Sequence, residues 1–120
     1  MQVAFISSRM GSLTSNIAGG MYGYRMSKAA ANMAARSIAV DLKSEGVAVA
    51  MLHPGAVITE LYHTYHRRPD QSPAVVSQSA PQDALTVEES VQGLLGCIDL
   101  LTLDNTGRFW TAVDGTELAW

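Results

Sequence analysis

The feature that most constrains the fold is an apolar pattern with helical spacing, placed between two short apolar runs. Apolar and small residues recur at intervals of three and four from Met26 to Leu42, which is typical of a helix with one buried face. Residues 3–7 and 47–52 are short apolar runs that indicate buried strands. A strand, a helix and a second strand in this order predict parallel strands joined by a right-handed crossover.

A second helix and a third strand follow. Thr86 and Glu89 have the spacing of a capping box, which predicts a helix beginning there, and residues 109–113 indicate a strand. The predicted fold is therefore α/β with the order β-α-β-α-β. Residues 10–23 are expected to form a loop, and residues 56–85 a long connection that serves as a functional lid or a mobile loop.

Composition limits the size and the partners of the fold. The chain has 120 residues, of which 48% are hydrophobic and 16% charged, which predicts one domain with a packed core. A net charge of -3 argues against nucleic acid or an anionic membrane as partner. The single cysteine fits a reducing compartment, and no stretch has the composition of a signal peptide or a membrane span. We therefore expect a soluble cytoplasmic protein.

Tyr24 and Lys28 are the strongest candidates for chemistry. A spacing of four places them one turn apart on one helix face, near the predicted start of the helix. A lysine ammonium beside a phenol favours the phenolate, so such a tyrosine can exchange a proton with a substrate oxygen. Ser8 ends the first strand and Pro54 and Gly55 end the second, and ligands of open α/β sheets bind at this edge.

The remaining polar candidates have structural interpretations. His53 is expected to play a structural or supporting role at a strand end, and His63 and His66 offer too few ligands for a metal site. Cys97 is predicted to be a small core residue. Both tryptophans are expected to pack in the core and the tail rather than against a cofactor.

These motifs, in this order, resemble the short-chain dehydrogenase/reductase family. They are residues 6–8, Tyr24-x-x-x-Lys28 followed by two alanines, and residues 54–59. Residues 24–33, the loop from 11 to 20 and the ending 114–120 are similar to one subgroup, which contains bacterial C-factor proteins and the sniffer-type carbonyl reductases of animals. The resemblance covers nearly the whole chain and implies a partial Rossmann-like, doubly wound parallel sheet.

The resemblance implies a role for each site residue. Tyr24 would be the general acid/base, and Lys28 would assist it and hold the nicotinamide ribose. Ser8 would hydrogen-bond the substrate oxygen, with Ser12 as the competing choice. The cofactor would be NAD or NADP, NADP being slightly favoured by the resemblance, and the substrate a small carbonyl compound. The nicotinamide side of the cofactor would be lined by Pro54, Gly55, Val57 and Thr59, together with Tyr24 and Lys28.

The sequence also departs from the family. It contains no glycine-rich turn of the form G-x-G-x-x-G, no Asn-Ala-Gly motif and no position that would select NAD over NADP. Residues 1–120 therefore correspond to a single C-terminal portion of the domain, the last three strands of a seven-stranded sheet, without the nucleotide-binding half. We expect one unpaired side on the first strand and a partly bare methionine and alanine face on the first helix.

Three functional hypotheses follow from these observations. The chain is the catalytic half of an NAD(P)-dependent carbonyl reductase, or a non-catalytic signalling or binding module similar to C-factor, or a fragment of a longer polypeptide. Its partner would be a second copy, paired through the long first helix as is common in the family, or a missing N-terminal half. The sequence does not identify the carbonyl substrate.

Overall fold

The computed structural model describes residues 1–66 and 82–120, which form a three-stranded parallel sheet. The strands are β1 (Gln2–Ile6), β2 (Ala48–His53) and β3 (Arg108–Thr111), in the order β1-β2-β3. Val3 pairs with Val49, and Met51 pairs with Phe109. The three predicted strands are confirmed, with ends that differ from the prediction by one or two residues.

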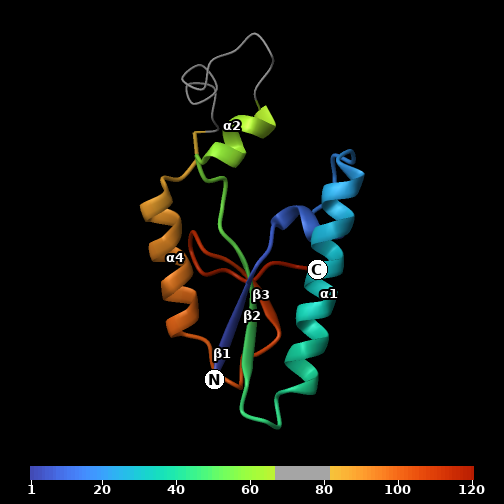
Figure 1. The fold of residues 1–120 in the computed structure, drawn as a ribbon, viewed down its shortest axis with the longest axis vertical. Helices are drawn as coiled ribbons and strands as arrows, with labels where there is room; N and C mark the ends of the chain where they lie inside the picture. Colours follow the sequence, from blue (N-terminus) through green and yellow to red (C-terminus); the bar gives the residue numbers. More distant parts are fainter. Residues whose placement is uncertain (67–81) are drawn as a thin grey trace.

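Helices cover both faces of the sheet. Helix α1 (Tyr22–Asp41) joins β1 to β2, and α4 (Val87–Asp99) precedes β3. The even-numbered residues of β2 pack with Cys97 and Leu101 in and after α4, and the odd-numbered ones pack with Ala35 and Ala39 of α1. Figure 1 shows the two helices on opposite sides of the strands. The predicted α/β, doubly wound arrangement is therefore confirmed.

The handedness of the crossovers corrects one expectation. The three strands follow one another in a single direction across the sheet, while α1 and α4 lie on opposite faces. Two such connections must have opposite hands, so the prediction of right-handed crossovers is wrong for one of them. Right-handed crossovers are the rule because a short strand–helix–strand unit packs back onto the sheet in only one way. The connection from β2 to β3 also contains α2 (Glu60–His66), which loosens this constraint.

Local signals explain where the two long helices begin and end. Thr86 accepts a hydrogen bond from the Glu89 amide, and the Glu89 carboxylate accepts one from the Thr86 amide, so the predicted capping box opens α4. Helix α1 ends at Asp41, and Gly46 then adopts a φ of 76°, which an L side chain rarely tolerates. The chain can therefore turn directly into β2.

Two short helices were not predicted. A 3₁₀ helix, η1 (Arg9–Gly11), interrupts the loop before α1, and α2 lies within the predicted long connection. Thr59 opens α2 by accepting a hydrogen bond from the Tyr62 amide (3.2 Å). Figure 1 shows α2 beyond the carboxyl ends of the strands. The rest of the predicted lid, residues 67–81, lies outside the described residues.

The C-terminal segment folds back over the α1 face of the sheet. The Leu118 amide donates to the Phe109 carbonyl (2.7 Å), and the Trp120 ring stacks on the Phe109 ring with 5.6 Å between centroids. Trp110 lies on the other face, in the core beneath α4. The predicted packing roles of both tryptophans and of the buried Cys97 are confirmed.

Two surfaces expose apolar groups, as the sequence predicts. Strand β1 is at the edge of the sheet, and its residues are less buried than those of β2. On α1, Met26 and Met33 are 65% and 68% exposed.

None of the described helices has the length and hydropathy to span a membrane.

Candidate active site

The carboxyl ends of β1 and β2 meet at one edge of the sheet and bring two predicted motifs together. The Ser7 amide donates to the Leu52 carbonyl (2.7 Å), which continues the pairing of the two strands. Ser8 therefore follows β1 beside the point where Pro54 follows β2. The first turn of α1, the helix that carries Tyr24 and Lys28, lies beyond the same edge in Figure 1.

Tyr24 and Lys28 occupy the first two turns of α1. Both side chains are partly exposed, and the Lys28 ammonium lies 5.8 Å from the centre of the Tyr24 ring. A cation at this position is attracted to the face of the aromatic ring. The phenol and the ammonium are thus neighbours on one face of the helix, as the spacing of four predicts.

The two serine candidates differ in what their hydroxyl groups do. Ser12 is buried, donates its proton to the Ala119 carbonyl (2.6 Å) and accepts from the Ser15 amide (3.1 Å). Ser8 caps η1 by accepting from the Met10 amide (3.2 Å), a bond that does not use its hydroxyl proton. Ser12 therefore holds the C-terminal segment in place, whereas Ser8 holds the first turn of η1.

Two contacts that the sequence analysis missed fix α1 against β1. The buried Ser7 hydroxyl donates to the Asn32 side-chain oxygen (2.5 Å), one helical turn beyond Lys28. A Cβ on Gly11 would lie 2.8 Å from the Lys28 carbonyl carbon, so only glycine lets η1 pack this closely on the helix. The Ser7–Asn32 contact could have been suspected from the sequence, because Asn32 is a polar residue on the predicted inner face of the helix.

The loop after β2 is braced by residues near α4. The Ser90 hydroxyl donates to the Pro54 carbonyl (2.8 Å). Gly55 has a φ of 89°, and a Cβ there would lie 2.7 Å from a Leu85 methyl carbon. Leu85 also pairs with the strand-like segment at Val57, where its amide donates to the Ala56 carbonyl (2.8 Å). Residues 54–58 therefore have a defined path, which sequence patterns did not predict.

His53 lies at the end of β2 on the same edge. Burial, reinforced by the nearby Arg9 cation, lowers the pKa of His53 from 6.5 to about 4. Its Nδ1 atom is buried and has no hydrogen-bond partner among the described residues. A neutral, partly buried imidazole supports the predicted structural role better than acid/base chemistry near neutral pH.

The residues at this edge fit one half of a dinucleotide better than the other. An ammonium at Lys28, the hydroxyl of Thr59 and the backbone of residues 54–57 offer donors and acceptors for a nicotinamide riboside. The Thr59 oxygen caps α2, and this bond leaves its proton available. No strand within residues 1–66 and 82–120 runs through a glycine-rich turn into a helix, so this part of the chain has no cradle for the pyrophosphate.

Metal chemistry finds no support in the described part of the chain. Outside residues 67–81, no group of three or more histidine, cysteine or acidic side chains could hold a metal ion. The His66 side chain lies outside the described atoms, so the pairing of His63 with His66 is untested.

Comparisons with known proteins identify relatives of this chain. It is 42% identical over 119 residues to the C-signal of Myxococcus xanthus, and 40% identical to the 1-hydroxy-2-glutathionyl-2-methyl-3-butene dehydrogenase of Rhodococcus sp. (strain AD45). Both matches cover 99% of this chain, but 61% and 46% of the respective relatives. The chain therefore spans roughly half the length of these two proteins.

Solved structures of carbonyl reductases also match nearly the whole of this chain and less than half of their own length. The carbonyl reductase Sniffer of D. melanogaster matches with a TM-score of 0.78 and 34% identity, over 99% of this chain and 41% of that one. The NADPH-bound carbonyl reductase from chicken fatty liver matches with a TM-score of 0.78 and 29% identity, over 99% and 42%. The sequence model of the short chain dehydrogenase family matches residues 2–70. The chain belongs to the short-chain dehydrogenase/reductase family.

Proposed function

We propose that this chain supplies the catalytic and substrate-binding half of an NAD(P)-dependent carbonyl reductase. It corresponds to the C-terminal portion of the family's domain, with the nucleotide-binding half supplied by another segment or chain. The coverage of 61% and 46% of two relatives supports this division. The observation that supports the proposal most directly is the contact of the Lys28 ammonium with the Tyr24 ring, on a helix whose first turn lies beyond the edge where β1 and β2 end.

Each residue has a defined task in carbonyl reduction. The bound nicotinamide supplies the hydride. Tyr24 donates its phenolic proton to the carbonyl oxygen, and Lys28 stabilises the phenolate that remains. Ser8 donates a hydrogen bond to the same oxygen as negative charge develops there. The product is an alcohol, and the phenolate recovers its proton from water.

Residues 54–59 and Lys28 hold the nicotinamide end of the cofactor in this proposal. Lys28 would hydrogen-bond the ribose hydroxyls. The nicotinamide ring would be lined by backbone groups of Pro54, Gly55 and Val57, and by the hydroxyl of Thr59. The NADPH-bound state of the chicken carbonyl reductase favours NADP slightly over NAD. The free thiol of the buried Cys97 is consistent with a cytoplasmic location.

A hybrid protein tests the cofactor assignment. The N-terminal half of D. melanogaster Sniffer, joined to residues 1–120, would restore the missing strands. Calorimetry should detect NADPH binding by the hybrid, and Lys28→Met should weaken it about tenfold, the loss expected for hydrogen bonds to a charged group. Lys43→Met is the matched control, because Lys43 is exposed beyond the C-terminal end of α1. Equal affinities in all three proteins would contradict the assignment.

A second candidate function is a non-catalytic signalling or binding module. Its support is the 42% identity to a protein named C-signal, together with the exposed methionine face of α1. In this case the chain would pair with a second copy or with a partner protein through α1 or the edge of β1. Sedimentation of the 120-residue chain tests pairing with a second copy: a dimer that Met33→Lys dissociates supports it. A monomer at every concentration, together with no partner protein retained in pull-downs, contradicts this function.

A further inference from the structure

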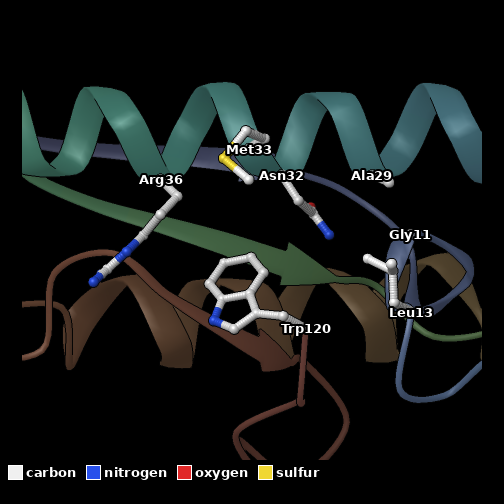
Figure 2. Close-up of a pocket in the computed structure, with 7 residues that line it drawn as sticks. All are labelled: Gly11, Leu13, Ala29, Asn32, Met33, Arg36 and Trp120. Carbon is white, nitrogen blue, oxygen red and sulfur yellow. The ribbon is translucent and has the colours of Figure 1, made fainter.

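A cavity of about 260 Å³ lies between α1 and the C-terminal segment, on the α1 face of the sheet. Figure 2 shows Arg36 at one end, Gly11 and Leu13 at the other, and Asn32 between them, with Trp120 forming the opposite wall. The proposed reduction does not use this cavity, because none of the residues that line it is assigned to proton transfer or to the cofactor.

Asn32 is the feature that points to a ligand. The residue is 2% exposed, and its oxygen already accepts the Ser7 hydroxyl proton. Its Nδ2 atom is buried and has no hydrogen-bond partner among the described residues. Figure 2 shows this nitrogen directed into the cavity, toward Trp120. A buried amide donor without a partner costs roughly 1–3 kcal/mol, so an acceptor placed in the cavity would recover this energy.

Arg36 adds positive charge to the same cavity. One of its guanidinium nitrogens, Nη1, donates to the Gly107 carbonyl (3.0 Å), which holds the side chain in place. That bond uses one of the five N–H groups of the guanidinium. Arg36 also has no carboxylate partner within salt-bridge distance, since the one ion pair among the described residues joins Arg108 to Glu117. The Asn32 amide and the Arg36 guanidinium are thus both donors, and the guanidinium is cationic.

The other walls are apolar. Leu13, Met33 and Trp120 are 77%, 68% and 40% exposed, so a ligand seated here would cover apolar surface that now faces water. The volume is just below the range of roughly 300–1,000 Å³ found for drug-sized ligands, which favours a smaller molecule.

We infer that this cavity binds a small carboxylate with an apolar body, such as a short fatty acid. The carboxylate accepts from the Asn32 amide and the Arg36 guanidinium, and the hydrocarbon chain covers Leu13, Met33 and the Trp120 ring. This site is independent of the proposed reductase function, because none of its side chains is assigned to proton transfer or to the cofactor.

Nuclear magnetic resonance of the 120-residue chain tests this inference, with hexanoate as the probe. The Asn32 side-chain amide and the Trp120 indole signals should shift and saturate, with millimolar affinity as is usual for so small a ligand. The Trp110 indole, on the opposite face of the sheet, is the internal control. Hexan-1-ol and hexylamine have the same chain and different head groups, and both should bind at least tenfold more weakly.

Three variants assign the binding to the named groups. Asn32→Asp keeps an oxygen for Ser7, removes the donor and adds a negative charge, so hexanoate affinity should fall at least tenfold. Arg36→Gln should reduce affinity about tenfold, the effect of losing a charged hydrogen bond. Arg108→Gln removes the same charge outside the cavity and should leave affinity unchanged. Where Asn32→Asp does not fold, Arg36→Gln and the two comparison ligands decide the outcome.

Three results would overturn the inference. Hexanoate could leave the Asn32 and Trp120 signals unmoved, hexylamine could bind as well as hexanoate, or Arg36→Gln could bind hexanoate with unchanged affinity.

Discussion

Two glycines in α4 provide a matched test of how this helix packs on the sheet. A Cβ added at Gly93 would lie 2.0 Å from the Ala112 carbonyl oxygen, far inside the 3.0 Å that real Cβ contacts respect. A Cβ added at Gly96, one turn later, would meet no atom within 4 Å. The same substitution to alanine therefore separates the packing of the helix from its intrinsic propensity.

The expected effects have opposite signs. Alanine in a helix interior is favoured over glycine by about 1 kcal/mol, so Gly96→Ala should stabilise the protein by up to this amount. Gly93→Ala has the same gain but must push α4 away from a backbone carbonyl, and such overpacking costs typically 1–3 kcal/mol or more. Because the propensity gain is the same in both variants, they should differ by the overpacking cost, roughly 1–3 kcal/mol or more. At about 4–8 °C per kcal/mol, their melting temperatures should differ by at least about 4 °C.

Thermal unfolding followed by circular dichroism measures this difference directly. The result also concerns the site, because Ser90, one turn before Gly93, holds the Pro54 carbonyl. A Gly93→Ala protein as stable as Gly96→Ala would refute the close approach of α4 to the end of β3.

Three further predictions concern single side chains. Because burial lowers the pKa of His53 from 6.5 to about 4, the unfolded chain binds a proton in this range that the folded chain does not. The free energy of unfolding should thus be highest above about pH 6.5 and fall by roughly 2 kcal/mol as the pH drops to 4, after a discount for solvent screening. Urea unfolding measured across this pH range should show the decrease in the original protein and in His63→Gln. It should be absent in His53→Gln. Thr86→Ala removes the cap of α4 and should cost about 1 kcal/mol in urea unfolding, and an unchanged midpoint would contradict the capping box. Ser12→Ala leaves the Ala119 carbonyl without its hydroxyl donor and should cost roughly 1–2 kcal/mol with altered Trp120 fluorescence, whereas an unchanged spectrum would contradict the anchoring of the tail.

Periodic patterns predicted most of the framework. The three strands, α1, α4 and the Thr86 capping box follow from local spacing and from residues that act on their immediate neighbours. The pairing of Tyr24 with Lys28 was predictable for the same reason, because both residues lie on one helix. Local rules of this kind need no knowledge of how distant segments meet.

Features that depend on distant contacts could not be predicted. Asn32 meets Ser7, Gly11 meets Lys28 and Gly55 meets Leu85 only after the sheet and helices have assembled. The handedness of one crossover was predicted wrongly, because the preference for right-handed crossovers in short strand–helix–strand units does not apply to a long connection. Helix α2 was missed because it is short and lies in a segment rich in polar residues.

The central claim is that Tyr24 is the proton donor of a carbonyl reductase site completed by another half-domain. The most direct measurement is NADPH-dependent reduction of 4-nitrobenzaldehyde by the Sniffer hybrid, with Tyr24→Phe compared with Tyr22→Phe. Tyr22 is two residues away and 78% exposed, so it controls for the loss of a hydroxyl group on the same turn. We expect Tyr24→Phe to lower kcat by roughly 10²–10⁴-fold and Tyr22→Phe to leave it unchanged. Equal turnover of the two variants would show that Tyr24 is not the proton donor.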